Sequence, residues 1–488
     1  MNCRLLALIG LLALVPAPVS AAPAPKRPNI VVVIADDWSF PHAGVYGDTV
    51  VKTPNFDRLA RDGVLFTRSF CAAPTCTASR GAFLTGQAAH RLEDGGDLWS
   101  HLPEKFRCYP DVLEAAGYAV GLTGKGWGPG SIEGTGRTRN PAGPTFRNFD
   151  AFLKTVPADQ PFCYWFGSTD PHRPYDKGTG VASGIDPRSV VVPPYFPDTP
   201  EVRADICDYY FVVQRFDRDL GTILQALEAR GVADDTLVVV TSDNGMPFPR
   251  CKANLYDIGN HMPLAIRWPG RARKGLTVSA FVSHTDLAPT FLEAAGLAPL
   301  PEMTGRSLLP LIEGSGAPRP APGRDAVFFE RERHAYVRAG NLGYPSRAIR
   351  TEHSLYIRNL RPDRWPAGDP ERVVAVGPFG DIDGSPTKDL ILDRRGDRRI
   401  APFYRLACAK RPAEELYDLE HDPHQLENIA GHPAHAALEA DLRARLDRWM
   451  ADTADPLARD PGNGREPFDD YPYVGAPGKG TPAAKARK

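Results

Sequence analysis

The chain has 488 residues, of which 42% are hydrophobic and 24% charged, a composition typical of an ordinary soluble globular protein. At this length we expect two packed units rather than one. The formal net charge of −1 offers no general attraction for a polyanion, and no basic tract interleaved with aromatic residues indicates binding of nucleic acid.

The first 22 residues have the features of a secretory signal peptide. Arg4 supplies the positive charge, residues 5–15 form an apolar stretch, and Val19-Ser20-Ala21 is a small-residue cleavage site. The apolar stretch is shorter than the about 20 residues that span a bilayer, and no later segment is long and apolar enough. We therefore expect an exported, soluble protein, periplasmic or secreted, with no membrane partner.

Short apolar runs that stop at polar residues predict the strands of a parallel sheet. The runs cover residues 29–35, 118–123, 161–168 and 236–241. Amphipathic helical stretches lie between them, at residues 54–62, 109–116 and 202–230. Strands that are apolar throughout are typical of a parallel sheet with helices on both faces. The sequence thus predicts a large, mostly parallel α/β domain over residues 23–324.

The pattern changes after a stretch rich in Gly, Pro and Ala at residues 314–324. Strand-like runs follow with no helix between most of them, at residues 326–330, 346–350, 355–359 and 415–419, and a helix is predicted at 434–450. Such strands favour an antiparallel sheet. We expect a smaller C-terminal α+β subdomain over residues 325–460 and a disordered, Pro/Gly-rich tail over residues 461–488.

Polar residues follow each predicted strand of the large sheet. They are Asp36 and Asp37, Lys125, Asp170 and His172, and Asp243 and Asn244. Ligands of open α/β sheets bind beyond the carboxyl ends of the strands, so we expect these residues to meet at one edge. The oxygen ligands of Asp36, Asp37, Asp243 and Asn244 suit Ca²⁺ or Mg²⁺ rather than zinc. The alternative is that each pair only caps the following turn.

Residues 74–86, with the sequence PTCTASRGAFLTG, resemble the signature of the sulfatase family. In that family the Cys, here Cys76, is oxidised to formylglycine, whose hydrated aldehyde is the nucleophile. The resemblance implies a formylglycine-generating or sulfatase-maturing enzyme as a partner. It also implies Ca²⁺ bound by Asp36, Asp37, Asp243, Asn244 and the modified Cys76. Ala78 departs from the Pro of many members. Without the resemblance, the run predicts a helix start with a buried Cys76 and a surface Arg80.

The resemblance also implies roles for other residues. Cys76 is expected at a helix N-terminus, which favours anions, with Arg80 one turn later bracing the site. Lys125 and Lys252 are similar to the two family lysines that hold sulfate oxygens. His172 is the expected general acid, because its ordinary pKa suits proton donation near neutral pH.

Two further features bear on the substrate. Asp170, beside His172, and the run Glu332, Arg333 and His334 are candidate sugar-binding residues; the alternative for that run is an exposed strand of alternating charge. The family commonly has a His where this chain has Trp127, so His101 or His334 is a candidate to replace it.

Within the family, several stretches are similar to the heparan N-sulfatase branch: residues 241–249, 304–310, 343–347 and 415–418. The resemblance implies a sulfohydrolase that removes sulfate from a sulfated carbohydrate, with N-sulfoglucosamine of heparan-type glycans as the target. The alternatives are an O-sulfatase for another polysaccharide, a phosphodiesterase or phosphonate hydrolase, and a catalytically silent glycan-binding protein. Release of sulfate from N- and O-sulfated glucosamine separates the first two.

Overall fold

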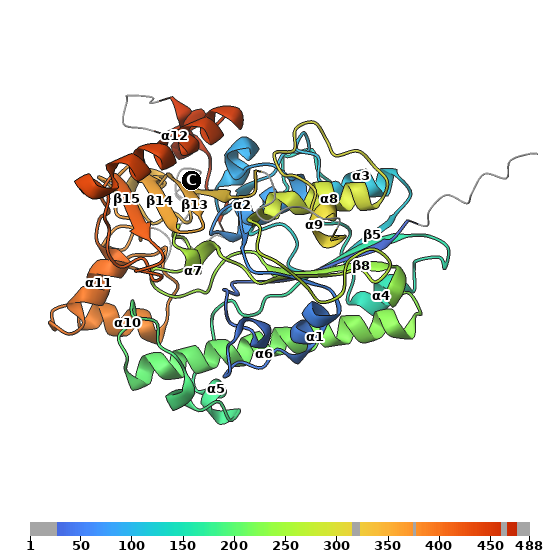
Figure 1. The fold of residues 1–488 in the computed structure, drawn as a ribbon, viewed down its shortest axis with the longest axis horizontal. Helices are drawn as coiled ribbons and strands as arrows, with labels where there is room; N and C mark the ends of the chain where they lie inside the picture. The colour runs from blue at the N-terminus through green and yellow to red at the C-terminus, as the bar shows by residue number, and fades with distance from the viewer. Residues whose placement is uncertain (1–26, 315–322, 374–376, 460–465, 476–488) are drawn as a thin grey trace, which may run out of the picture.

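The computed structural model describes residues 27–314, 323–373, 377–459 and 466–475. A seven-stranded sheet in the order β10-β2-β9-β8-β1-β7-β5 forms its centre (Figure 1). Its strands are β1 (Asn29–Ala35), β2 (Val64–Phe66), β5 (Ala119–Gly124), β7 (Phe162–Gly167), β8 (Thr236–Ser242), β9 (Leu264–Arg267) and β10 (Leu276–Val278). The four predicted strands are β1, β5, β7 and β8, and they pair in parallel as expected.

Helices cover both faces of this sheet (Figure 1). One face carries α1 (Pro54–Asp62), α4 (Phe149–Leu153) and α6 (Pro200–Ala229), and the other α2 (Cys76–Thr85), α3 (Tyr109–Ala115) and α8 (Leu287–Ala294). Every residue of β1 is buried, because alternate side chains point to opposite faces. Val31 packs with the core on the α6 side and Val32 with the core on the α2 side. The mostly parallel α/β fold is therefore confirmed.

The sequence pattern did not predict β2, β9 and β10. These strands have only three or four residues, and β9 runs antiparallel to both β8 and β2, so no helical crossover marks its position. The smaller elements are β3 (Ser69–Phe70), β4 (Ser100–His101), β6 (Gly130–Ser131), β11 (Val282–Ser283), α5 (Thr179–Ala182), α7 (Asp257–Asn260) and α9 (Leu309–Ile312).

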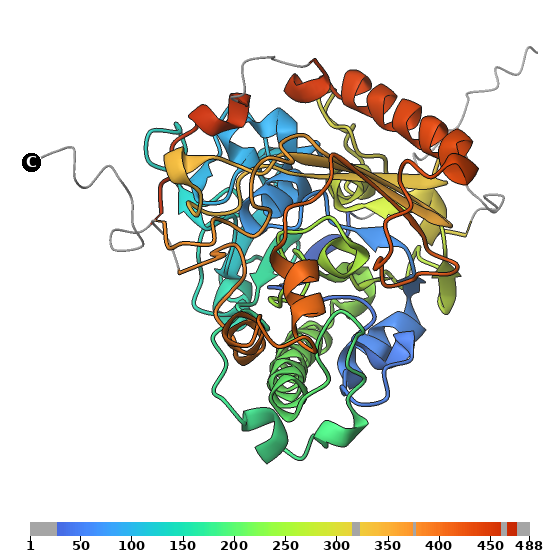
Figure 2. The same ribbon diagram turned by 90° about the vertical axis from the view of Figure 1, so that its left-hand side faces the viewer.

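The C-terminal subdomain is built on a separate antiparallel sheet, as predicted. Its strands are β12 (Ala326–Arg331), β13 (Ser346–Thr351), β14 (Ser354–Asn359) and β15 (Glu414–Asp418), in that order. The helix α12 (Ala436–Asp452) lies along its outer face (Figure 2), where Leu446 packs with Tyr356 and Leu416. Two helices that the sequence pattern did not predict, α10 (Pro386–Asp393) and α11 (Ala401–Cys408), follow the third strand.

The two parts are joined by specific contacts. The rings of Phe70 and Phe329 stack with centroids 5.7 Å apart. In a second contact between the two parts, Thr387 Oγ1 in α10 donates a hydrogen bond to Asp205 Oδ2 in α6 at 2.6 Å. The loop before α10 is thereby fixed against the large domain.

Part of the predicted disordered tail is packed. Residues 466–475 include a short 3-10 helix (Pro467–Asp470) in which Phe468 joins the core beneath α12. Arg364 donates two hydrogen bonds to Asp469, at 3.0 and 2.7 Å. The prediction of disorder is wrong for this stretch, because an apolar side chain and a carboxylate both find partners in the subdomain.

The predicted signal peptide, residues 1–22, and most of the predicted linker lie outside the described residues. Within the described ranges, no helix combines the length and the apolar character needed to cross a membrane. The seven described cysteines are all free thiols and all buried.

Candidate active site

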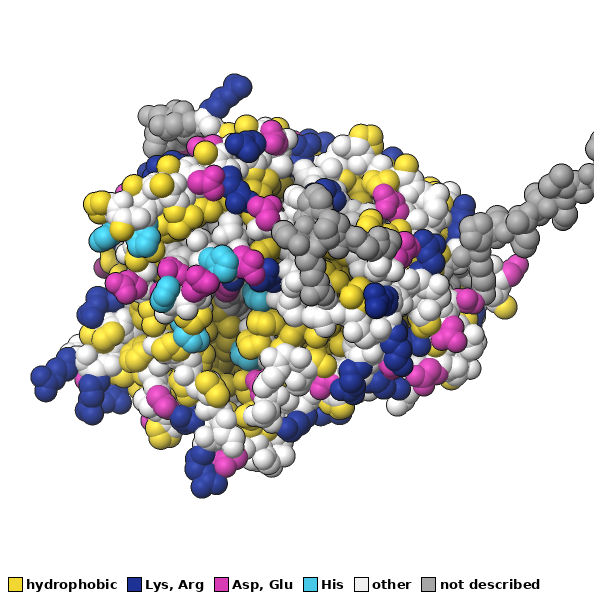
Figure 3. Space-filling view, viewed as in Figure 1, with side chains coloured by type: hydrophobic (Ala, Val, Ile, Leu, Met, Phe, Trp, Pro, Cys, Tyr) yellow, Lys and Arg dark blue, Asp and Glu magenta, His cyan; other side chains and the backbone are white. Residues whose placement is uncertain are grey.

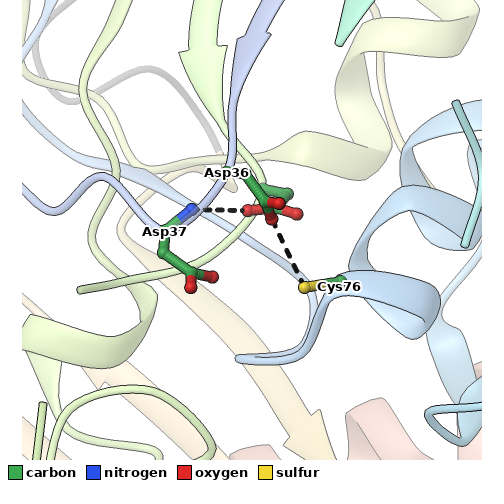
Figure 4. A group of neighbouring side chains, drawn as sticks. Asp36, Asp37 and Cys76 are labelled. Carbon is green, nitrogen blue, oxygen red and sulfur yellow. Dashed lines mark hydrogen bonds between the residues drawn. The ribbon is translucent and has the colours of Figure 1, made fainter. Parts of the chain in front are cut away.

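The carboxyl ends of β1 and β8 meet the N-terminus of α2. Asp36 and Asp37 follow β1, Asp243 and Asn244 follow β8, and Cys76 is the first residue of α2. The Cys76 thiol donates to Asp36 Oδ1 at 3.5 Å, and the backbone N–H of Asp37 donates to Asp243 Oδ1 at 3.0 Å (Figure 4). All five side chains are buried. Residues far apart in the sequence are thus gathered at one sheet edge.

This group has the composition of a metal site. One atom each of Asp36, Asp37, Cys76 and Asp243 lie within 4.8 Å of one another. Asn244 Oδ1 is buried and has no hydrogen-bond partner among the described residues, while its Nδ2 donates to Asp37 Oδ1 at 2.6 Å. Clustered oxygen ligands of this kind fit a hard divalent cation, which would take up the unpaired oxygen and relieve repulsion between the carboxylates.

Each of the three carboxylates is paired with a cationic side chain. Lys125 Nζ lies 2.6 Å from Asp36 Oδ1, and Lys252 Nζ lies 2.8 Å from Asp37 Oδ2. Arg80 Nε donates to Asp243 Oδ2 at 2.8 Å.

Arg80 is completely buried, so the alternative of a surface arginine is wrong. Its Nη1 donates to the backbone oxygens of Lys125 and Gly126 at 2.7 and 3.1 Å. Arg80 therefore fixes the turn that carries Lys125 as well as the carboxylate of Asp243.

Burial and the neighbouring charges shift the pKa values of these groups in opposite directions. Burial alone would raise the pKa of Asp36, but Lys125 and Arg80 hold it far below its usual value. For Asp37 burial prevails over Lys252 and raises the pKa to about 6. Burial raises the pKa of the Cys76 thiol well above its usual value, although Lys125 and Lys252 oppose this. Cys76 is therefore a neutral thiol at neutral pH.

A cavity of about 780 Å³ opens onto this group, and residues of both domains line it. His172 lies in its wall with a side chain 34% exposed. Its Nδ1 contacts the backbone oxygen of Arg173 at 2.5 Å, and because that oxygen only accepts, Nδ1 carries a proton. Nε2 lies 3.8 Å from Asp37 Oδ2, which belongs to the cluster of candidate metal ligands. His172 thus has one ring nitrogen anchored to the backbone and the other directed at the carboxylate of Asp37.

The other candidate substrate residues divide into two groups. Asp170 lines the cavity, where it is paired with Arg215, and His334 lines it too, with its Nδ1 2.7 Å from Thr75 Oγ1. Glu332 and Arg333 do not line it.

Glu332 and Arg333 are buried inside the subdomain. A carboxylate oxygen of Glu332 lies 2.6 Å from Arg347, and Arg333 lies 3.2 Å from Asp97 and donates to the backbone oxygen of Tyr471 at 2.8 Å. The alternative of an exposed strand of alternating charge is therefore also wrong. Both side chains have structural partners, which accounts for charged residues at these positions.

Trp127 lies in the cavity wall. Of the two histidines considered as replacements for the family His, His334 lines the cavity, whereas His101 is paired with Asp94 at 2.9 Å and does not. Burial lowers the pKa of His334 to about 4, so its ring is neutral at neutral pH.

The sequence reasoning missed several lining residues. Trp99, Asn140, Arg215, Asp383 and Tyr473 belong to the cavity wall. None of them follows a strand of the large sheet, so the pattern of strand ends gave no signal for them. Asp383 and Tyr473 come from the C-terminal subdomain and from the predicted tail.

A second cavity, of about 550 Å³, lies apart from this site and has a different character. Its wall contains apolar and aromatic side chains such as Phe40, Val192 and Tyr195. Figure 3 shows an apolar hollow in this part of the surface, bordered by histidine and acidic side chains. Its wall contains none of the lysines that pair with the carboxylates, so the candidate site residues lie at the first cavity.

Comparison with known families agrees with this geometry. The family described as Sulfatase matches residues 28–131 and 140–297, and the family described as N-sulphoglucosamine sulphohydrolase, C-terminal, matches residues 251–365. The first match includes Cys76, Lys125, His172 and Lys252.

Individual relatives point the same way. The chain is 31% identical to N-sulphoglucosamine sulphohydrolase of Homo sapiens, over 88% of this chain and 91% of that protein. It is 28% identical to an ulvan-active sulfatase of Formosa agariphila, over 89% of this chain and 82% of that protein. A solved structure of a protein in complex with its substrate D-glucosamine-2-N,6-O-disulfate has a TM-score of 0.65 at 21% identity and covers 90% of this chain and 100% of the other, which shows a shared fold. The chain is therefore a member of the sulfatase family.

Proposed function

We propose that this sulfatase removes the N-linked sulfate from N-sulfoglucosamine in heparan-type glycans. The single observation that carries the proposal is the meeting of Cys76, two lysines and a group of carboxylates at the base of one cavity. The choice of N-sulfoglucosamine is supported by the similarity to the human sulphohydrolase over most of both chains.

The nucleophile is expected to be formylglycine made from Cys76. A buried thiol with a raised pKa is a poor nucleophile, so the side chain needs modification to react at neutral pH. When present, the hydrated aldehyde would supply the oxygen that attacks sulfur, and Asp36, Asp37, Asp243 and Asn244 would hold a Ca²⁺ that lowers the cost of negative charge on that oxygen. The proposal therefore includes a formylglycine-generating or sulfatase-maturing enzyme as a partner of the unmodified chain.

The chain's own residues bind and polarise the sulfate. Lys125 and Lys252, held by Asp36 and Asp37, line the same cavity as Cys76 and are proposed to bind sulfate oxygens. Positive charge fixed before the reaction stabilises the charge that develops on the sulfuryl group. Arg80 positions the Lys125 turn and does not line the cavity.

His172 is the proposed general acid. Its Nδ1 is anchored to the backbone of Arg173, so the proton for the leaving atom comes from Nε2. Asp170, with Arg215, and His334 are proposed to contact the sugar from the cavity wall. Because sequence features of a signal peptide precede the described chain, we also propose that the protein is exported to the periplasm or secreted.

The test is release of inorganic sulfate by the matured protein from defined sulfated sugars. We expect release from glucosamine N-sulfate and much slower release from glucosamine 6-O-sulfate. The similarity to an ulvan-active sulfatase supports an O-sulfatase as the second candidate, and faster release from O-sulfated substrates would establish it. Absence of release from every sulfated sugar would contradict both.

A further inference from the structure

One carboxylate in the cavity is not used by the proposed mechanism. Asp383 lines the cavity and belongs to the loop that leads into α10. Its Oδ2 is buried and accepts no hydrogen bond from any described residue; the nearest cation, Lys252 Nζ, is 3.6 Å away and already bonded to Asp37. An unsatisfied buried carboxylate oxygen is costly unless something in the functional complex donates to it.

Asp383 lies beside the proposed general acid. A carboxylate oxygen of Asp383, one of Asp37 and a ring nitrogen of His172 all lie within 4.8 Å of one another. Because His172 must reach the atom that leaves sulfur, Asp383 flanks the same atom.

The loop that carries Asp383 is rigidly held. Asp381 accepts hydrogen bonds at 2.7 Å from both Arg331 and Arg338, and it also accepts one from the backbone N–H of Ala335 at 3.1 Å. Lys388 Nζ donates to the backbone oxygen of Ile382 at 2.7 Å. The position of Asp383 is therefore fixed before substrate binds.

A carboxylate at this place distinguishes the two kinds of sulfated sugar. In a sulfamate the atom bonded to sulfur carries an N–H, which donates to a carboxylate. In a sulfate ester the corresponding oxygen has only lone pairs, which a carboxylate repels. A site built to accept an N–H discriminates strongly against the analogue that lacks it.

We propose that Asp383 accepts a hydrogen bond from the sulfamate N–H and so selects N-sulfate over O-sulfate; this inference rests on the proposed function. When the S–N bond breaks, its electron pair stays on nitrogen, His172 Nε2 supplies one proton to that nitrogen, and sulfur forms its new S–O bond to the deprotonated oxygen of the nucleophile. The N–H bonded to Asp383 becomes more polar as nitrogen is protonated, so the contact strengthens along the reaction.

The matched substrates are glucosamine N-sulfate and glucose 2-sulfate, which differ at the sulfur-bearing atom as NH or O. We expect Asp383→Ala in the matured enzyme to lower kcat/KM for the N-sulfate by roughly 10- to 100-fold and to leave that for the 2-O-sulfate unchanged or higher. Asp383→Asn, which keeps an acceptor oxygen without the charge, should fall between. Asp389→Asn, an exposed carboxylate in α10, is the control and should change neither value.

A binding measurement separates this inference from the proposed function. In a Cys76→Ala background, which cannot form the nucleophile, calorimetry with both sugars should show that adding Asp383→Ala weakens binding of the N-sulfate alone. Equal losses for the two sugars, in turnover or in binding, would overturn the role of Asp383. If the matured wild type releases no sulfate, the proposed function fails, and the binding comparison still decides whether Asp383 recognises the N–H.

Discussion

At the scale of single residues, the site is a balance of buried charges. Asp36, Asp37 and Asp243 are paired with Lys125, Lys252 and Arg80, so the group is close to neutral before any ligand binds. A divalent cation and a sulfate group bring opposite charges and leave that balance intact. In the proposed mechanism, the cation would bind the carboxylates, and the two lysines would then be free to bind sulfate oxygens. The proposal thus accounts for charged side chains that are almost fully buried at a site for both a metal and an anion.

Replacement of Lys252 by Ala tests the role of the lysines. Loss of one fixed charge at the sulfuryl group should lower kcat roughly 10²- to 10³-fold, the range seen when one preorganised donor is removed from an active site. Sulfate release measures the effect, and a melting curve checks that the fold persists. Lys274→Ala is the control, because that lysine is 75% exposed and pairs with Asp62 away from the cavity. Nearly unchanged turnover by Lys252→Ala would show that Lys252 holds no sulfate oxygen.

At the scale of elements, the second domain completes the catalytic cavity. The strand β12 and the loop before α10 bring His334 and Asp383 to a cavity whose base is made by β1, β8 and α2. Arg331, at the end of β12, is tied to Asp381 in that loop. The first three residues of the run 331–334 therefore stabilise the subdomain through buried ion pairs. His334, the last residue of the run, lines the cavity.

Removal of the Asp381 side chain tests this connection. Asp381→Ala leaves Arg331 and Arg338 buried without their common partner, and breaking a buried ion pair in this way typically costs about 3–5 kcal/mol. We expect a clear drop in melting temperature, together with reduced turnover because Asp383 is no longer held. Asp389→Ala on the same segment should change neither. A variant as stable as the wild type would contradict the structural role given to Asp381.

At the scale of the whole molecule, the parallel architecture was readable from the sequence because each apolar run ended in polar residues. That pattern also located Asp36, Asp37, Asp243 and Asn244, since strand ends of a parallel sheet share an edge. The sequence pattern did not predict which charged residues are buried, because their burial depends on tertiary contacts. Burial of Glu332 depends on Arg347 in the neighbouring strand β13, and burial of Arg333 depends on Asp97, which is remote in sequence.

The same reason accounts for the missed residues of the cavity. No sequence pattern around Asp383 predicts that it lies at the cavity. Its loop is positioned by ion pairs with β12 and by the contact of α10 with α6, which are tertiary contacts. The short strand β9 was missed because it pairs antiparallel between parallel strands. Membership of the sulfatase family was predicted from the residues around Cys76, because these residues form one continuous stretch of the sequence.

Binding of the metal should stabilise the whole fold, because a ligand that binds only the native state adds to its stability. At a Ca²⁺ concentration of 100 times the dissociation constant the gain is about 2.7 kcal/mol. We expect chelation to lower the melting temperature and to abolish sulfate release, and Ca²⁺ to restore both. Asp243→Asn should lose the response to Ca²⁺. A melting temperature that is insensitive to chelation and to Ca²⁺ would contradict the metal site.

The central claim is that Cys76 becomes the nucleophile of this cavity. The most direct measurement is mass spectrometry of the tryptic peptide of residues 69–80, from protein purified from its native host. The peptide also contains Cys71, which serves as an internal reference for an unmodified thiol. We predict an aldehyde at position 76 and a thiol, available for alkylation, at position 71. Two unmodified thiols would contradict the account.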